Sequence, residues 1–214
     1  MPKDKFLVKV CGMKDSSNIE ELSKLPIDYM GHIFYAKSPR YTSTLENSNL
    51  PKHIKKTGVF VNASLEEIQQ KIDQFDLEAV QLHGNEQPEL LVQLKSSAVE
   101  LIKAFGITDD FPWSTLAPYL DLVDYFLFDT KSKEYGGTGI PFNWEKLTSY
   151  PYEKPYFLSG GLSLDNLENA VRFADTRLIG FDLNSKFEIE PGIKQIDKLK
   201  EALNIIHHEQ ISSK

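Results

Sequence analysis

The chain has 214 residues, of which 41% are hydrophobic and 26% are charged, and we expect residues 1–214 to form one domain with a substantial core. Its formal net charge of −7 argues against a nucleic-acid or membrane partner, because both reward clustered Lys and Arg. An anionic small-molecule substrate remains compatible with this charge, since a site needs only local positive charge.

Apolar residues are spread along the chain rather than gathered into long runs. The first residues lack a signal-peptide core, and no run reaches the roughly 20 apolar residues of a membrane span, so a cytoplasmic protein is expected. A single cysteine excludes an internal disulfide. The five histidines are scattered without ligand spacing, which predicts no metal site.

Short apolar runs in the first half of the chain predict five strands. A helix through residues 18–22 follows the first strand, whereas Pro39 predicts a loop after the second. Ser64 lies three residues before Glu67, as in a capping box, and leucines at helical spacing from Leu90 predict another helix. The five strands are expected at residues 6–11, 29–35, 57–62, 79–83 and 100–105.

The second half of the chain predicts three more strands. Residues 109–120 show only a weak helical pattern, whereas Ser163 marks the start of a clear helix. A last helix is expected from Ile193, with a polar tail from about residue 207. The three strands are expected at residues 125–130, 155–159 and 177–183.

Eight strands alternating with helical segments indicate an α/β fold of parallel βαβ units with right-handed crossovers. A doubly wound open sheet satisfies the same pattern. A single (β/α)8 barrel is favoured because the strand count is eight, the length lies near the low end of the usual ~200 to 400 residues, and no strand looks like a polar edge. In such a barrel the active site lies where strands lead into helices.

Several polar side chains interrupt strands that otherwise look buried. Where one strand carries two of them, as with Lys9 and Cys11, they are two residues apart and therefore face the same side. Ordinary core pairing would explain each one singly, but together they favour a polar pocket. The set comprises Lys9, Cys11, Gln81, His83, Lys103, Asp129, Ser159 and Asp182.

Glycine-containing segments near these residues indicate ligand binding. Asp129 ends a buried strand and precedes Gly136–Gly139, a segment with freedom to move that includes Thr138. Gly160–Gly161 leads into a helix and Asn184–Ser185 follows the eighth strand; backbone N–H groups at such turns bind phosphate. A tight turn without a ligand would explain Gly160–Gly161 equally well.

Eight short motifs occur in an order that matches one family. They stand at residues 9–13 (KVCGM), 34–41 (FYAKSPRY), 59–62 (VFVN), 81–84 (QLHG), 128–130 (FDT), 136–139 (GGTG), 159–162 (SGGL) and 191–192 (PG). With these motifs the chain resembles the phosphoribosylanthranilate isomerase family of tryptophan biosynthesis from residue 8 to residue 199.

The resemblance implies an Amadori rearrangement, in which an aminoaldose carrying anthranilate and a 5-phosphate becomes a 1-amino-2-ketose. By similarity, Asp129 is the general acid at the ring oxygen, Cys11 is the general base at C2, and Arg40 binds the anthranilate carboxylate. No cofactor is implied, and a monomer and a homodimer are both compatible with the sequence. The remaining substrate-binding residues are expected to be Gln81, His83, Thr138, Gly160, Gly161, Asp182, Asn184 and Ser185.

The residue types suit this chemistry. An aldose-to-ketose shift needs one group to give a proton at the ring oxygen and another to take one at C2. A thiol is a base only as thiolate, so Cys11 should feel positive charge, for which Lys9 is a candidate. Asp129 must carry a proton near neutral pH, which burial among aromatic residues would favour, and the planar fork of Arg40 suits a carboxylate.

Departures and competing interpretations concern few positions. Lys186 stands where the family has a glycine beside the phosphate turn, Ile140 where it has a lysine, and Gln195 where it has an aspartate. A sibling isomerase of histidine synthesis would carry an aspartate in place of Cys11. A phosphate-binding barrel without turnover would lose a catalytic side chain, and a redox sensor would need a resolving cysteine.

Overall fold

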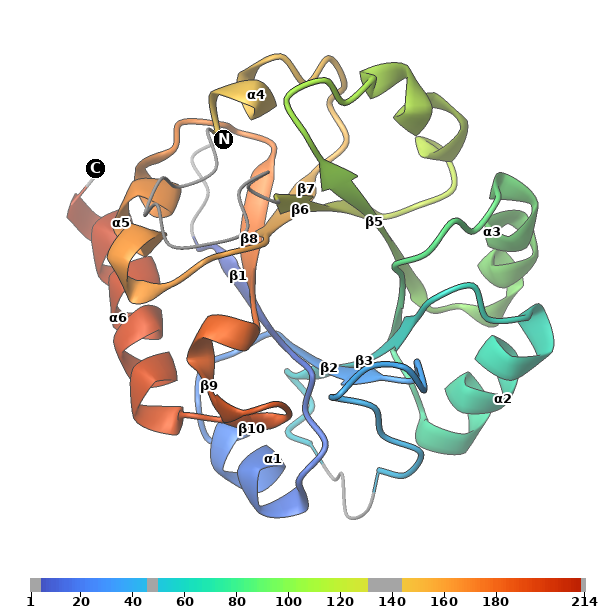
Figure 1. The fold of residues 1–214 in the computed structure, drawn as a ribbon, viewed down its shortest axis with the longest axis horizontal. Coiled ribbons are helices and arrows are strands. Elements are labelled where there is room, and N and C mark those ends of the chain that lie inside the picture. Colours follow the sequence, from blue (N-terminus) through green and yellow to red (C-terminus); the bar gives the residue numbers. More distant parts are fainter. Residues whose placement is uncertain (1–4, 46–49, 131–143, 213–214) are drawn as a thin grey trace.

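The computed structural model describes residues 5–45, 50–130 and 144–212, in which eight parallel strands close into a barrel (Figure 1). Each strand pairs with the next along the chain, and the first pairs with the eighth, which confirms the closed barrel over the open sheet. The strands are β1 (Leu7–Cys11), β2 (Tyr29–Ile33), β3 (Lys55–Phe60), β4 (Ala79–Leu82), β5 (Glu100–Ile107), β6 (Tyr125–Thr130), β7 (Tyr156–Ser159) and β8 (Leu178–Leu183).

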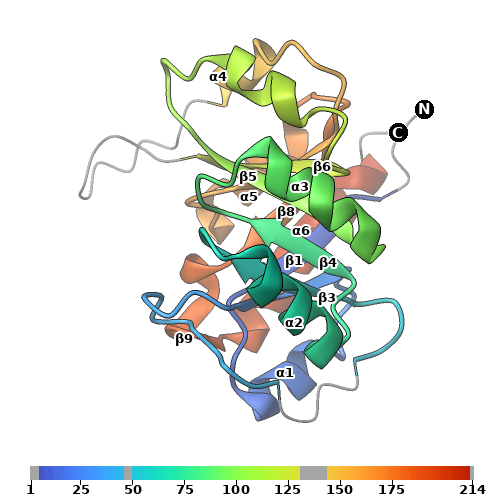
Figure 2. The same cartoon turned by 90° about the vertical axis from the view of Figure 1, so that its right-hand side faces the viewer.

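Helices surround this barrel, as the two perpendicular views show (Figures 1 and 2). Ser64 caps its helix as expected, because its Oγ accepts a hydrogen bond from the backbone N–H of Glu67 at 3.2 Å. At Ser163 the backbone N–H donates to Oδ1 of Asn166 at 2.9 Å. The helices are α1 (Ser16–Leu22), α2 (Leu65–Phe75), α3 (Pro88–Leu94), α4 (Glu145–Thr148), α5 (Leu164–Arg172) and α6 (Ile196–Ser212).

Local structure differs from the sequence expectation in two places. The weak helical pattern at 109–120 is a 3₁₀ segment, η2 (Trp113–Tyr119), and Pro118 within it lacks the N–H that an α-helix would need. Ile193 belongs to a hairpin rather than to the last helix. This hairpin pairs β9 (Glu188–Glu190) with β10 (Ile193–Lys194) antiparallel, and Gly192 with φ of +92° completes its turn.

The inside of the barrel is filled by an interior plug of Tyr29, Ala79, Ile102, Ala104, Leu127 and Phe157. These side chains come from β2, β4, β5, β6 and β7 and are almost completely buried. Because side chains alternate along a strand, residues two positions further on also face inward, nearer the ends that lead into helices. The plug therefore closes the barrel with apolar side chains below the strand ends that lead into helices.

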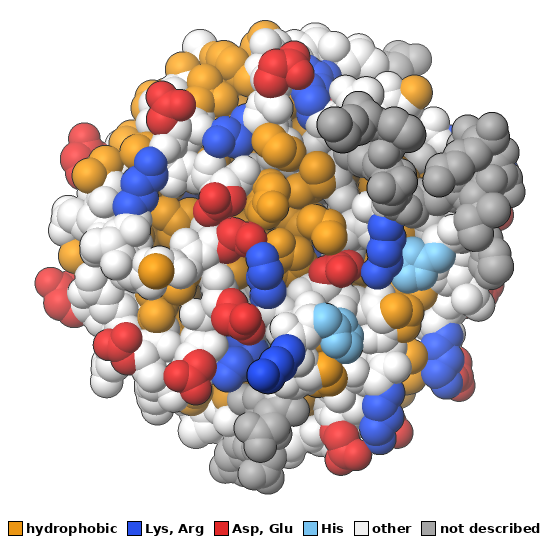
Figure 3. Space-filling view, turned by 180° about the vertical axis from the view of Figure 1, so that it is seen from behind, with side chains coloured by type: hydrophobic (Ala, Val, Ile, Leu, Met, Phe, Trp, Pro, Cys, Tyr) orange, Lys and Arg blue, Asp and Glu red, His pale blue; other side chains and the backbone are white. Residues whose placement is uncertain are grey.

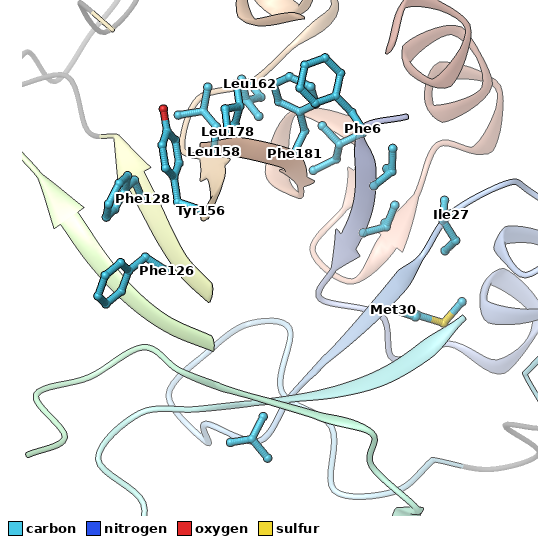
Figure 4. Close-up of a cluster of buried hydrophobic side chains, with 14 of the residues drawn as sticks. Phe6, Ile27, Met30, Phe126, Phe128, Tyr156, Leu158, Leu162, Leu178 and Phe181 are labelled. Carbon is cyan, nitrogen blue, oxygen red and sulfur yellow. The ribbon is translucent and has the colours of Figure 1, made fainter. Parts of the chain in front are cut away.

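A second apolar core lies between the strands and the helices. Phe126 and Phe128 on β6 and Tyr156 on β7 project outward together (Figure 4), with the ring centroids of Phe128 and Tyr156 4.6 Å apart. On the back of the view in Figure 1, charged side chains of both signs surround a central group of hydrophobic ones (Figure 3). Among the described residues, no helix is both long and apolar enough to cross a membrane.

One buried histidine fixes the segment after β1. His32 on β2 is fully buried, and its Nδ1 lies 3.1 Å from the carbonyl oxygen of Met13. Burial lowers the pKa of His32 to about 4, and the nearby positive charges of Lys56 and Lys9 act in the same direction. The neutral imidazole is therefore the form that the folded chain accommodates.

We expect the outer core to respond strongly to truncation. Phe126→Ala should lower the free energy of unfolding by about 3–5 kcal/mol, because it removes a buried ring and leaves a cavity. Val92→Ala, at a side chain that is 57% exposed, is the matched control and should change it by less than about 0.5 kcal/mol. Urea unfolding of the two variants beside the parent would measure both; similar losses would contradict the described packing.

His32 should make stability depend on pH. Its pKa is about 4 in the folded chain and 6.5 in the unfolded one, so the unfolded state takes up a proton first as pH falls. Stability should decline from about pH 6.5 towards pH 4, by up to about 3 kcal/mol. In His32→Gln this part of the decline should be absent, as followed by urea unfolding between pH 7 and 5. An unchanged slope in the variant would rule out His32 as its source.

Candidate active site

Polar side chains occupy the inside of the barrel just above the interior plug. Leu127 and Phe157 belong to the plug, and Asp129 and Ser159, two residues further along the same strands, are paired in register. Lys9 and Asp182 are likewise register partners where β1 meets β8. Of the polar residues expected to share a pocket, the structure thus brings together those on β1, β6, β7 and β8.

Lys9 and Asp182 form a buried ion pair. Nζ of Lys9 lies 2.9 Å from Oδ1 of Asp182, and Oγ of Ser159 lies 3.4 Å from the other carboxylate oxygen. Burial alone would lower the pKa of the Lys9 ammonium, but the charges of Asp182 and Cys11 outweigh it and the pKa is raised. Lys9 is therefore a fixed positive charge beneath the end of β1.

Cys11 stands at the end of β1, above Lys9, and is almost fully buried. Burial raises the pKa of its thiol; the positive charges of Lys9 and Lys194 oppose this rise, whereas Asp182 adds to it. Lys9 thus supplies the positive charge expected beside the thiol, yet desolvation has the larger effect. A Cβ at Gly31 on β2 would come within 2.8 Å of Sγ, so this glycine, which was not among the expected residues, makes room for the thiol.

Asp129 faces a histidine that directly follows β4. Nε2 of His83 lies 3.5 Å from Oδ2 of Asp129, whose side chain is 18% exposed. Nδ1 of His83 lies 2.9 Å from Nε2 of Gln81, which is buried on β4. These three expected residues form one chain of contacts that ends at the carboxyl group of Asp129.

Lys103 does not belong to this pocket, contrary to the expectation from its strand. Ile102 and Ala104 on either side of it lie in the interior plug, so Lys103 faces outward. Its Nζ lies 3.1 Å from Oε2 of Glu86, and that carboxylate accepts the backbone N–H groups of Asn62 and Gly84. The pair holds the loops after β3 and β4, and Gly84 directly follows His83.

Arg40 lies at the rim of the barrel, over Gly12, where a Cβ would come within 2.7 Å of its Cδ. Its guanidinium holds Glu188 through one edge, with Nε 2.9 Å from Oε1 and Nη2 2.6 Å from Oε2. Nζ of Lys194 reaches both Oε1 of Glu188 and Oδ1 of Asn184, each at 2.7 Å. Neither Glu188 nor Lys194 is among the site residues expected from the sequence. The sequence feature that could have indicated them is a pair of opposite charges, one on each side of the Pro191–Gly192 turn.

One of the two expected phosphate turns has the left-handed backbone that glycine allows. Gly160 and Gly161 have φ of +88° and +66°, and nothing lies within 4 Å of where a Cβ on Gly161 would be. α5 follows directly, while Ser185 begins the 3₁₀ turn η3 (Ser185–Phe187) and is exposed. Thr138 and the segment 136–139 lie outside the described residues. Within the described chain, no group of three His, Cys, Asp or Glu is placed to hold a metal ion.

Two of these side chains are groups that can take up and release protons. A thiol from β1 and a carboxyl group from β6 stand at the strand ends, with β7 and β8 between them on one side of the ring. An ionisable pair above a closed apolar floor, at the end where strands lead into helices, is typical of a (β/α)8-barrel enzyme.

Comparison with known proteins identifies the family. The family described as N-(5'phosphoribosyl)anthranilate (PRA) isomerase matches residues 8–204, and the chain belongs to it. It is 42% identical over 213 residues to the N-(5'-phosphoribosyl)anthranilate isomerase of Parabacteroides distasonis, covering 97% of this chain and 96% of that protein.

Solved structures of the same family share the fold. The phosphoribosyl anthranilate isomerase of Thermotoga maritima has a TM-score of 0.82 and 31% identity, covering 95% of this chain and 99% of that one. A phosphoribosyl anthranilate isomerase solved in complex with reduced 1-(o-carboxyphenylamino)-1-deoxyribulose 5-phosphate has a TM-score of 0.80 and 28% identity, covering 95% and 98%.

The raised pKa of Cys11 is open to direct measurement, because the chain has one cysteine. The ultraviolet absorbance of the thiolate, followed against pH, should show a midpoint above the ordinary value of about 8.5. Cys11→Ser, titrated in parallel, removes the tyrosine contribution. A midpoint near neutral pH would show that the lysines outweigh burial.

Proposed function

We propose that this protein catalyses the Amadori rearrangement of N-(5-phosphoribosyl)anthranilate to 1-(2-carboxyphenylamino)-1-deoxyribulose 5-phosphate in tryptophan biosynthesis. The observation that carries the proposal is that Cys11 and Asp129 both stand at strand ends of a barrel that belongs to this isomerase family. The product analogue bound by one relative has the carbon skeleton of this product.

In the proposed mechanism Asp129 and Cys11 move one proton each. The carboxyl group of Asp129 gives a proton to the furanose ring oxygen, the C1–O bond breaks, and the nitrogen lone pair forms an iminium. The thiolate of Cys11 then removes the C2 proton, and the electrons of that C–H bond form the C1=C2 bond of an enolamine. Protonation at C1 and loss of the proton of the C2 hydroxyl then give the ketone. Since burial disfavours the thiolate, the ammonium groups of Lys9 and Lys194 are what sustain a basic Cys11.

Substrate binding is proposed to use the two charged ends of the molecule. Arg40 would hold the anthranilate carboxylate, while the turns at Gly160–Gly161 and Asn184–Ser185 would hold the phosphate with backbone N–H groups. Gln81, His83 and Asp182 would line the space between, and Thr138 would contribute a further contact. The chemistry needs no cofactor, because every step is a proton transfer or a rearrangement of electron pairs within the substrate.

Location and assembly are also proposals. A small-molecule biosynthetic substrate suits a cytoplasmic enzyme. One structurally similar relative from Thermotoga maritima is described as a dimeric isomerase from which monomers were generated, with a TM-score of 0.76 and 27% identity. A monomer or a homodimer is therefore the assembly we propose, since the barrel closes within one chain.

The decisive test is loss of anthranilate-type fluorescence when purified protein meets phosphoribosylanthranilate generated in the cuvette. Rapid loss is expected with the parent protein. In Cys11→Ser and Asp129→Asn the rate should fall by about 10²–10⁴-fold, because each removes one of the two proton carriers. Circular dichroism and urea unfolding of each variant provide the folding control.

Two outcomes would contradict the proposal. An inactive parent protein that the phosphate-bearing substrate still protects against heat would be a binding barrel without turnover. Full activity in a folded Cys11→Ser variant would show that the thiol is not the base.

A further inference from the structure

Contacts on two sides hold the β9–β10 hairpin in place beside the site. The backbone N–H of Lys194 donates to Oδ1 of Asn18 at 2.7 Å, and Nδ2 of Asn18 donates to the carbonyl of Lys194 at 3.0 Å, which fixes the hairpin to α1. On the other side, Glu188 and Lys194 turn buried side chains towards Arg40 and Asn184. Figure 1 shows the hairpin beside β1 and α1. Its charged residues therefore have fixed positions.

Glu188 occupies one edge of the Arg40 guanidinium and leaves the other edge available. Nε and Nη2 donate to Glu188, whereas Nη1 has no hydrogen-bond partner among the described residues. A guanidinium has five N–H donors in a planar fork, so the Nη1–Nη2 edge can still donate two parallel hydrogen bonds. Arg40 is 19% exposed, so this side chain is reachable from outside.

The charges of this cluster also favour an anion. Burial alone would raise the pKa of Glu188, but hydrogen bonds from Arg40 and Lys194 outweigh it and the pKa is lowered. One ionised carboxylate therefore faces two cations, Arg40 and Lys194, and leaves the cluster with an excess positive charge. A second carboxylate, brought by a ligand, would complete the balance.

We propose that Glu188 is a positioning residue that fixes Arg40 so that its remaining edge faces the carboxylate of the bound substrate. This rests on the proposed function, in which Arg40 binds that carboxylate. Glu188 does not touch the substrate; it acts by holding the guanidinium plane against rotation. Its effect should therefore depend on the substrate having a carboxylate and on Arg40 being present.

The first test compares two substrates. In Glu188→Gln, KM for phosphoribosylanthranilate should rise about 10–100-fold with kcat nearly unchanged, because a contact equally strong in ground and transition states is weakened. With the phosphoribosyl derivative of aniline, which lacks the carboxylate, parent and variant should have the same kcat/KM. Glu190→Gln makes the same change at an exposed residue of the same strand and should leave both substrates unaffected. Equal losses with both substrates would overturn the proposal.

The second test is a double-mutant cycle. If Glu188 acts through Arg40, adding Glu188→Gln to Arg40→Met should produce no further loss with phosphoribosylanthranilate. Additive losses would overturn the proposal, whereas an inactive parent protein would instead refute the proposed function. Should Glu188→Gln fail to fold, Glu188→Asp keeps the charge and retracts it by one methylene. Glu188→Asp should show a smaller rise in KM, and only with the carboxylate-bearing substrate. An equal rise in KM with both substrates would overturn the proposal.

Discussion

A lysine buried inside a protein is tolerated only beside a counter-charge, and the ion pair between Lys9 and Asp182 meets this need where the barrel closes. The two residues come from the first and last strands, so the pair joins the ends of the ring. Removing one partner of such a pair typically costs about 3–5 kcal/mol, because the other charge is left buried and alone. The carboxylate of this pair also receives Ser159, and Cys11 stands two residues beyond Lys9 on the same strand.

The charged residues of the site form two groups, one deep in the barrel and one at its rim. In the deep group, directly above the interior plug, the charges of Lys9 and Asp182 balance one another in a low-dielectric surrounding. At the rim, Arg40 and Lys194 share a single carboxylate from Glu188. Cys11 lies between the two groups and interacts with the charges of both lysines. Burial therefore favours the neutral thiol of Cys11, whereas the lysines on its two sides favour the thiolate.

Much of this architecture can be predicted from the sequence because strands of a buried parallel sheet consist of nearly continuous runs of apolar residues. All eight strands lie within two residues of their expected bounds, and Asp129 stood out as a carboxylate at the end of one of them. Lys103 was misplaced because a strand buried on both faces gives no signal of which parity faces inward. Glu188 and Lys194 were missed because charged residues beside a Pro-Gly turn are usually solvent-exposed. Gly31 was missed because only the neighbouring strand reveals that a thiol needs its space.

The contacts that complete the site join residues that are remote along the chain. Lys9 and Asp182 are separated by 173 positions, and the hydrogen bonds between Asn18 and Lys194 span 176. Contacts of such high sequence separation form late, since the entropy of closing the intervening loop must be overcome before they stabilise anything. During synthesis from the N-terminus, one edge of β1 therefore stays unpaired and Lys9 lacks its counter-charge until β8 has been made. The pairing of β8 with β1 closes the barrel and at the same time brings Asp182 to Lys9 in the site.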